Sequence, residues 1–209
     1  TEFALMQAQI NPHFLYNTLD TLVWLIESGE ISEAVKIVAS LSNYFRFSLS
    51  RGKNVITVEE EEQHIRSYLE IQQMRYQDLM EYEIDIPEEV KKYILPKLTL
   101  QPVVENALYH GIKNTRRKGT IRLTGRVENE RIILEVTDDG CGMTGERLEE
   151  VRASLTDNKR EGFGLRTVHQ RIQILFGPEY GLAIESKPDE GTRVIVTIPM
   201  KTSDKEMSL

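Results

Sequence analysis

The stretch Asp138-Asp139-Gly140-Cys141-Gly142-Met143 follows a run of apolar residues, and it does more than any other segment to decide the fold. Upstream, residues 103–111 (VVENALYHG) have the spacing of a helix, and downstream Gly162-Phe163-Gly164-Leu165 opens a second helical pattern. Each segment is weak alone, because an Asp-Gly pair is common in turns and a glycine pair is common in hinges. Their order along one chain makes the set informative.

The carboxylate at the end of the apolar run is suited to binding a heterocyclic ring. An ionised Asp138 can accept a hydrogen bond from an adenine amino group. Gly140 and Gly142 carry no side chain, so the backbone there can approach a ring closely. The alternative for this segment alone is an ordinary Asp-Gly turn.

Two other segments offer groups that suit phosphates and a metal ion. The amide oxygen of Asn106 is a hard ligand of the kind that magnesium prefers, although a buried, hydrogen-bonded asparagine is the alternative. Gly162 and Gly164 precede a helix, whose free amides and positive dipole end favour an anion. A flexible hinge is the alternative there. Arg166 could add a phosphate contact or remain in solvent.

Taken in order, the three segments resemble the nucleotide pocket of the ATP-binding superfamily that includes gyrase, the heat-shock chaperone, mismatch-repair proteins and histidine kinases. The resemblance implies that Asp138 reads adenine and that Asn106 holds the Mg²⁺ that bridges the phosphates of ATP. It also implies that residues 143–161 form a mobile lid over the nucleotide. The residues it assigns to ATP binding are Asn106, His110, Lys113, Asp138, Gly140, Gly142, Met143, Gly162, Gly164, Leu165 and Thr192.

Residues 7–17 (QAQINPHFLYN) resemble the phospho-acceptor segment of the LytS/YesM-type sensor histidine kinases. His13 lies on a polar stripe with Gln9, Asn17 and Thr21 at a spacing of four residues. A neutral imidazole is a nucleophile near physiological pH, so His13 can attack a γ-phosphoryl group. Pro12 cannot donate a helical hydrogen bond and is expected to kink the helix. A solvent-facing or capping histidine is the alternative for one isolated residue.

The chain departs from the family pattern at several positions. Many histidine kinases place an acid directly after the acceptor histidine as the general base, and Phe14 stands there in this chain. Glu105 is a candidate for the base, although a salt bridge is equally compatible with it. Tyr109 replaces a lysine that often faces phosphate, a role that Lys113 or Arg116 could take. Pro102 replaces the water-activating glutamate of the hydrolytic relatives, which favours phosphoryl transfer over ATP hydrolysis.

The periodicity predicts an α+β chain, in which a helical hairpin precedes a two-layer α/β sandwich of the type that the resemblance implies. Residues 1–78 are expected to form a helical dimerisation and phospho-acceptor segment, 79–201 the ATP-binding domain and 202–209 a polar tail. The apolar ridges of the hairpin would be covered by a second copy in a four-helix bundle, or else by the ATP-binding domain.

The predicted helices cover residues 3–27, 31 to about 52, a helix capped by Thr57 and Glu60, 102–110 and 164–176. The predicted strands cover 82–86, 120–127, 131–136, 182–187 and 192–200, with 96–100 extended and 143–155 a loop with helical pieces.

Composition narrows the class of partner. The 209 residues carry a formal net charge of −7, which gives no general attraction for nucleic acid or anionic lipid. One cysteine, Cys141, allows no intramolecular disulfide, and no run of apolar residues is long enough for a transmembrane segment.

The chain reads as a fragment of a longer protein, which the resemblance implies is a membrane receptor with this part on the cytoplasmic side. The expected function is autophosphorylation of His13 and transfer to a response-regulator receiver domain; a conformational ATPase clamp and a degenerate nucleotide-binding dimerisation module are the alternatives.

Overall fold

The computed structural model describes residues 11–49, 53–157 and 164–203. Contacts within the chain divide it into two compact units: Thr1–Lys53 with Glu62–Gln77, and Asn54–Glu61 with Asp78–Leu209. The first, helical unit therefore lacks residues 54–61, which were expected in it and instead pack with the second, sheet-containing unit. The two units are described separately.

The helical unit is formed by α2 (Pro12–Glu27), α3 (Ile31–Ser48) and the greater part of α4 (Val58–Arg75). Asn11 caps α2 by accepting the backbone N–H of His13 on its side chain at 3.0 Å. The expected kink is wrong for the described residues, because Pro12 is the first residue of α2, where a missing N–H costs no helical hydrogen bond. Gly29, with φ of 80°, lies in the turn between α2 and α3, where the left-handed conformation favours glycine.

The core of the helical unit contains two clusters of buried side chains. Near the start of α2, the ring of Phe14 lies 4.9 Å from that of Tyr44 and 5.1 Å from that of Tyr68. Near the turn, Leu25 packs with Ala34 and Ile37. The predicted ridges are therefore only partly buried, since Leu19, Ile26 and other large apolar residues of α2 and α3 remain exposed.

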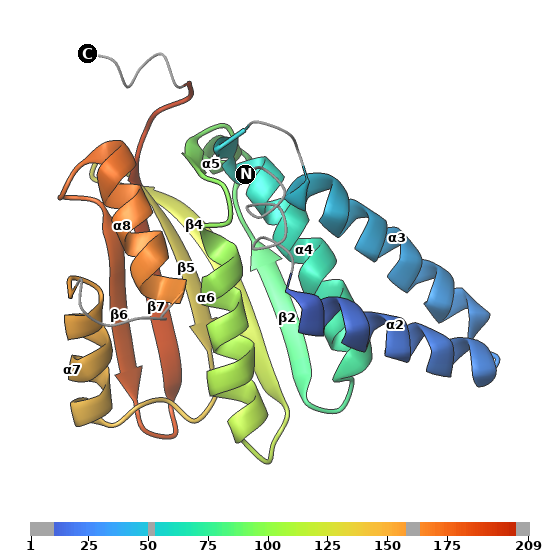
Figure 1. Cartoon of the computed structure of the whole chain (residues 1–209). Coiled ribbons are helices and arrows are strands. Elements are labelled where there is room, and N and C mark those ends of the chain that lie inside the picture. Colours follow the sequence, from blue (N-terminus) through green and yellow to red (C-terminus); the bar gives the residue numbers. More distant parts are fainter. Residues whose placement is uncertain (1–10, 50–52, 158–163, 204–209) are drawn as a thin grey trace. The chain divides into compact units, whose positions relative to one another are not determined.

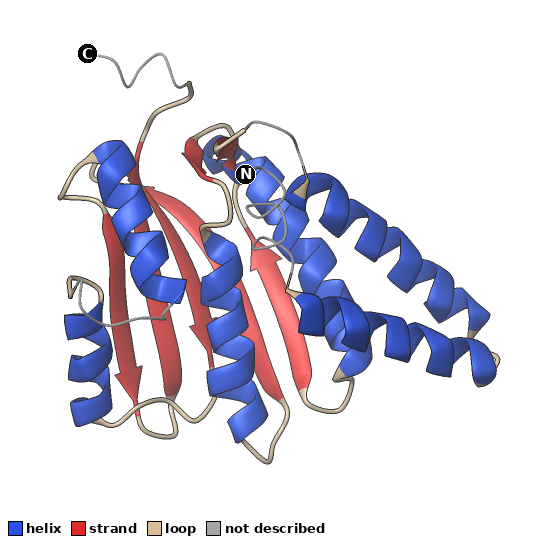
Figure 2. Cartoon of the chain, in the orientation of Figure 1, coloured by secondary structure: helices blue, strands red, loops and turns tan. Residues whose placement is uncertain are grey.

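The second unit is built on a five-stranded mixed sheet in the order β2-β4-β5-β7-β6 (Figure 2). Its strands are β2 (Met80–Asp85), β4 (Gly119–Glu128), β5 (Arg131–Asp138), β6 (Gly181–Lys187) and β7 (Gly191–Pro199). The two predicted hairpins, β4–β5 and β6–β7, pair antiparallel, whereas β2 runs parallel to β4. A small separate ladder pairs β1 (Val55–Thr57) with β3 (Ile94–Pro96).

Helices cover one face of the sheet (Figure 1), which confirms the predicted two-layer α+β architecture. They are α6 (Leu100–Asn106), α7 (Gly145–Ser154) and α8 (Gly164–Phe176). Helix α6 continues as a π-helical turn (Ala107–Gly111) and a 3-10 turn (Ile112–Asn114). The short helix α5 (Glu88–Lys91) contacts β4. The opposite face carries ion pairs such as Arg122–Glu83 and Arg126–Glu135. Buried side chains at alternate positions, such as Ile121 and Leu123, fill the space under the helices.

Several predicted elements need correction. The helix expected over 102–110 begins two residues earlier at Leu100 and changes to π-helical geometry after Asn106. Residues 143–155 were expected to form a loop with helical pieces, and residues 145–154 of it form one continuous ten-residue helix, α7, which Thr144 caps. The capping box is confirmed: Thr57 N–H donates to Glu60 Oε2 at 2.9 Å, and Glu60 N–H donates to Thr57 Oγ1 at 3.2 Å. Within the described ranges, no helix is both long enough and apolar enough to cross a membrane.

Candidate active site

A cavity of about 280 Å³ lies in the second unit between the helices and the sheet. Residues from α6, the end of β5, the turn after it, α7, the start of α8 and the β6–β7 hairpin line it. The predicted binding residues that line it are Asn106, His110, Asp138, Gly142, Met143, Leu165 and Thr192. Three segments that are far apart in the sequence therefore meet at one concave site.

Asp138 supplies the buried carboxylate of this cavity. Its side chain is 8% exposed, and its Oδ1 accepts the backbone N–H of Gly140 at 2.9 Å. Burial raises the pKa of Asp138 to about 6, while the hydrogen bond from Gly140 acts in the opposite direction. A carboxylate in this position can accept a further hydrogen bond from a ligand donor inside the cavity.

The two glycines after Asp138 are required by packing within the protein. A Cβ at Gly140 would lie 2.3 Å from the carbonyl carbon of Gly111, so the two backbones can meet only if this residue is glycine. Gly142 has φ of 63°, and a Cβ there would lie 1.8 Å from the carbonyl oxygen of Lys187. Gly142 lines the cavity, and Gly140 packs against the backbone of Gly111, which also lines it. The approach of Gly140 to a ring stays a prediction.

Asn106 faces the same cavity from the end of α6. The π-helical turn that follows it brings His110, four residues on, onto the cavity wall as well. The described residues contain no group of three or more His, Cys, Asp or Glu side chains able to hold a metal ion on their own. A single amide oxygen in a cavity suits Mg²⁺ that takes most of its ligands from phosphates and water. The donor set therefore fits a magnesium–nucleotide complex and does not fit a protein-only metal site.

Some residues assigned to the site from the sequence lie elsewhere. Glu105 does not line the cavity; it accepts a hydrogen bond from Gln101 Nε2 at 3.0 Å, and burial raises its pKa. The Lys113 ammonium lies 4.8 Å from the centre of the Tyr109 ring, outside the lining. Gly164 packs against Pro102, and Gly162 lies outside the described residues.

The cavity also contains residues that sequence reasoning did not select. Arg147 and Val151 reach it from α7, and Asn114 reaches it from the 3-10 turn. Arg147 was missed because no continuous helix was predicted over residues 145–154, although Thr144 at the start of α7 is a recognisable cap. Arg166, considered for a phosphate contact, donates to the carbonyl oxygen of Asp157 at 2.9 Å.

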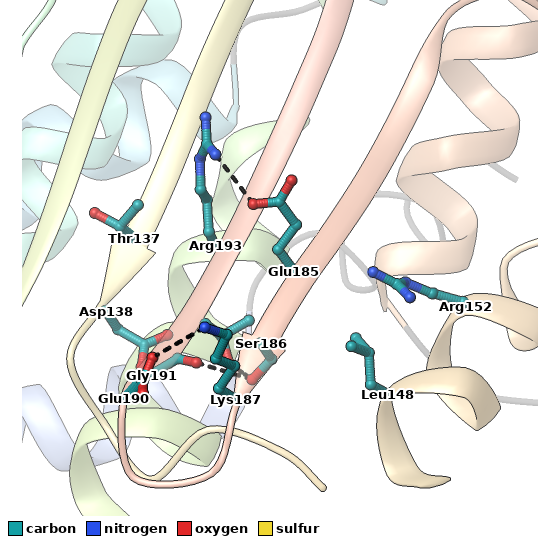
Figure 3. A pocket seen from close by; sticks show the side chains of 11 residues that line it. Thr137, Asp138, Leu148, Arg152, Glu185, Ser186, Lys187, Glu190, Gly191 and Arg193 are labelled. Carbon is teal, nitrogen blue, oxygen red and sulfur yellow. Dashed lines mark hydrogen bonds and ion pairs between the residues drawn. The ribbon is translucent and has the colours of Figure 1, made fainter. Parts of the chain in front are cut away.

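A second, more open hollow of about 440 Å³ lies over the β6–β7 hairpin (Figure 3). Arg193 and Glu185 are joined there by an ion pair at 3.0 Å, while Arg152 donates to the carbonyl oxygen of Ile184 at 2.7 and 3.0 Å. The charged side chains of this hollow pair with one another, so it has fewer groups than the smaller cavity to bind a phosphate or a nucleobase. The smaller cavity, which joins the glycine segments to Asn106, is the candidate site.

His13 lies in the helical unit with its side chain exposed. Its neighbour Phe14 is 2% exposed and packs against the rings of Tyr44 and Tyr68. Since adjacent residues of a helix point about 100° apart, the imidazole of His13 is directed away from this cluster. Asn17 follows one turn later and is half-buried, and its backbone carbonyl accepts the hydroxyl of Thr21 at 2.9 Å. The stripe expected along α2 is therefore present from His13 onward, while Gln9 lies outside the described residues.

The other histidines of the two cores have structural contacts. His64 is buried in the helical unit, stacks on Tyr44 with ring centres 4.6 Å apart and pairs with the Ser48 hydroxyl at 3.1 Å. His169 Nδ1 accepts the backbone N–H of Leu182 at 2.9 Å, and burial lowers its pKa. Cys141 lines the candidate cavity and donates its thiol to the carbonyl oxygen of His110 at 3.1 Å.

The mixed sheet, the helices on one of its faces and the cavity at Asp138 are the features to compare with known protein families. Residues 96–202 match the family model described as histidine kinase-, DNA gyrase B- and HSP90-like ATPase, and residues 1–80 match the histidine kinase model. Within that class, the chain belongs to the sensor histidine kinase family.

Similar proteins carry the same description. The chain is 38% identical to the sensor histidine kinase YesM of Bacillus subtilis over 96% of its own length and 34% of that protein. It is 34% identical to the sensor protein LytS of Bacillus anthracis over 98% of its length and 35% of that protein. The chain thus spans about a third of the length of these relatives.

Solved structures support the fold. The histidine kinase domain of a blue-light activated histidine kinase from Erythrobacter litoralis superposes with a TM-score of 0.54 at 18% identity, covering 98% of this chain and 96% of that one. The catalytic domain of the histidine kinase ThkA gives a TM-score of 0.53 at 16% identity, covering 72% of this chain and 97% of that one. At these identities the likeness concerns the fold alone.

Proposed function

We propose that this chain is the catalytic core of a sensor histidine kinase that binds ATP with Mg²⁺ and transfers the γ-phosphoryl group to His13. The observation that carries the proposal is the meeting of Asp138, Asn106 and His110 in one cavity of a unit with the family's fold. Mg-ATP needs two kinds of group from the protein. A buried carboxylate can accept a hydrogen bond from the adenine amino group, and an amide oxygen can bind the metal ion. Mg²⁺ would neutralise charge on the phosphates.

The acceptor half of the proposal rests on the exposure of His13. A ring nitrogen of His13 would form a bond to the γ-phosphorus, the bond from that phosphorus to the bridging oxygen would break, and ADP would leave. The resulting phosphohistidine loses the ring proton to a base or to water. Phe14 has no group that can take a proton, and its ring packs in an aromatic cluster, so the proton must pass to another residue or to water.

Glu105 and Asn17 are the candidates for assisting roles in this step. Burial raises the pKa of Glu105, which brings a carboxylate closer to the range in which it can take a proton near neutral pH. Asn17 lies one helical turn after His13 and can orient the imidazole or the incoming phosphoryl group. We propose these two roles on residue type and position.

The helical unit is proposed to form a homodimer. Large apolar side chains are exposed at a spacing of three and four residues on both α2 and α3, which is the pattern of a helix-bundle seam. We call this surface the hairpin stripe; it comprises Tyr16, Leu19, Val23 and Ile26 of α2 with Ile31, Val35 and Val38 of α3. A second copy would bury the hairpin stripe in a four-helix bundle.

The phosphoryl group is proposed to pass from His13 to an aspartate of a response-regulator receiver domain. The relatives are sensor proteins about three times as long as this chain, so we propose that the whole protein is a membrane receptor with this part on the cytoplasmic side. The net charge of −7 supports a protein partner over nucleic acid.

One experiment separates the kinase from its alternatives. Incubation with ATP labelled in the γ-phosphate and Mg²⁺ should leave acid-labile label on the protein. Free labelled phosphate without labelled protein would indicate an ATPase clamp, a reading that Pro102 disfavours because no carboxylate stands at that position. Nucleotide binding without either product would indicate a degenerate binding module.

A further inference from the structure

Glu61 is a fully buried carboxylate that no step of the proposed reaction uses. It lies in the first turn of α4 and is 0% exposed. Its Oε1 accepts the backbone N–H of Leu100 at 2.8 Å, and its Oε2 accepts that of Leu98 at 3.2 Å. Both oxygens are therefore committed to the segment in which α6 begins.

The start of α6 needs an external cap. Thr99 occupies the N-cap position in a helical conformation, and no side-chain capping bond is formed there. The Thr99 hydroxyl instead donates to the carbonyl oxygen of Pro96. Leu98, one residue earlier, has φ of 60°, a conformation that residues other than glycine rarely adopt. Glu61 satisfies amides on both sides of this turn, in place of a local cap.

Two cationic side chains surround the same carboxylate. Arg171 of α8 and Lys97, which precedes the turn, both interact electrostatically with Glu61. Lys97 is 7% exposed and Arg171 is half-buried. These are the charged groups that face Glu61 from the elements packed against it in the described part of the chain. The carboxylate thus joins the first turn of α4 to the two helices, α6 and α8, whose residues line the nucleotide-site cavity.

We propose that Glu61 is a positioning residue for the phosphate end of the nucleotide site. It acts by fixing the start of α6, and through that helix it fixes Asn106 six residues later. This inference rests on the proposed function, because it assigns to Asn106 a role in holding Mg-ATP. Asp138, on β5, is not attached to this turn, so adenine recognition should depend much less on Glu61 than the magnesium contact does.

Ionisation of Glu61 should matter for this role. Burial raises its pKa to about 7, while hydrogen bonds from Leu100 and Leu98 and the charge of Arg171 act against that rise. The ionised carboxylate accepts both amides, whereas the protonated form is a weaker acceptor. The start of α6 is therefore expected to be better protected at pH 8 than at pH 6.

The test compares Glu61→Gln and Glu61→Ala with Glu59→Gln, a matched change at an exposed acid of the same helical turn. The first measurement is hydrogen exchange over residues 98–106 without nucleotide. Loss of one or both bonds should speed exchange there by about fivefold or more in the Glu61 variants, with strand β7 and the Glu59 variant unchanged. Unchanged exchange over residues 98–106 would overturn the proposal.

The second measurement is ATP affinity with and without Mg²⁺. In the Glu61 variants, the gain in affinity from Mg²⁺ should fall by about fivefold or more, with metal-free affinity within about twofold of wild type. Equal losses in both conditions, with a lowered melting temperature, would indicate general destabilisation and overturn the positioning role. If both variants failed to fold, exchange of the wild type at pH 6 and pH 8, corrected for intrinsic rates, would decide: equal protection of Leu98 and Leu100 would overturn the proposal.

Failure of the proposed function is distinguishable from failure of this inference. Wild-type protein that bound no ATP would refute the proposed function, whereas the exchange measurement needs no nucleotide. Faster exchange in Glu61→Gln would still establish the tie between the first turn of α4 and the start of α6.

Discussion

The ring of Phe14 lies 4.9 Å from the ring of Tyr44, while the imidazole of the preceding residue, His13, is exposed to solvent. Adjacent residues on a helix point about 100° apart, so burial of one side chain directs the other outward. The residue that stands where many histidine kinases have an acid therefore has a packing role in this chain. It anchors the start of α2 against α3.

Replacement of Phe14 should destabilise the helical unit. Phe14→Ala removes a ring that is 2% exposed and leaves a cavity, so we expect the free energy of unfolding to fall by about 3–5 kcal/mol. Phe14→Leu should cost less, because it fills part of the same space. Urea denaturation followed by circular dichroism measures both, with the exposed His13→Gln as the control. A Phe14→Ala protein as stable as wild type would show that the aromatic cluster does not support α2.

A charge placed in the hairpin stripe should disrupt the proposed dimer. Val35 is 61% exposed in the single chain, so Val35→Glu should fold normally. In a dimer it would bury an unpaired carboxylate, at a cost of about 2 kcal/mol or more. Sedimentation should show dimers for wild type and for Ser32→Glu, an exposed position outside the stripe, and monomers for Val35→Glu at the same concentration. An undisturbed dimer in Val35→Glu would place the interface elsewhere.

Affinity for ATP should depend on pH through Asp138. Because burial raises the pKa of this carboxyl to about 6, it is protonated in much of the free protein below pH 6 and then accepts a hydrogen bond from adenine poorly. The affinity should therefore fall as the pH falls from 7 to 5, by up to about tenfold for each unit below the pKa.

Calorimetric titration of wild type and Asp138→Asn measures this dependence. The variant should bind more weakly at pH 7, by about 1–3 kcal/mol, and its affinity should vary less with pH. Because the phosphates of ATP also titrate in this range, the difference in affinity between wild type and Asp138→Asn at each pH isolates the contribution of Asp138. A folded Asp138→Asn protein with wild-type affinity would exclude Asp138 from the adenine site.

Asn106→Ala should separate nucleotide binding from magnesium-dependent chemistry. The substitution removes the one amide oxygen of α6 that faces the cavity, while Asp138 and the apolar lining remain. Metal-free ATP affinity should change little, and autophosphorylation with Mg²⁺ should be lost. Asn114→Ala, a second asparagine of the lining, is the matched control. Wild-type rates of autophosphorylation in Asn106→Ala would contradict the metal role.

Local sequence patterns predicted the helices whose ends are set by neighbouring residues. The helix Gly164–Phe176 agrees with its predicted bounds because Gly177-Pro178 ends it, and the Thr57–Glu60 capping box forms as its spacing indicates. The region of α7 was predicted only as a loop with helical pieces, because its sequence is mostly charged and has almost no apolar periodicity; only Leu148 and Ser154 are buried.

Features that depend on contacts between distant residues could not be predicted from the sequence. The parallel pairing of β2 with β4 joins strands separated by the whole of α6, and no local turn specifies it. Glu61 is one of several acids at the start of α4, and its partners, Leu98 and Leu100, lie 37 and 39 residues away, so the local sequence does not single it out. The close packing of Gly140 against the backbone of Gly111, about thirty residues earlier, could not be predicted from the sequence around either glycine.

The most direct test of the central claim is autophosphorylation of wild type and His13→Gln with γ-labelled ATP and Mg²⁺. Glutamine keeps a polar side chain and a similar helix propensity, so α2 should persist and ATP binding in the other unit should be unaffected. Wild type should carry label that is labile in acid and stable in base, and His13→Gln should carry none. Label that persists in His13→Gln, or that mass spectrometry assigns to His64, His110 or His169, would contradict the account.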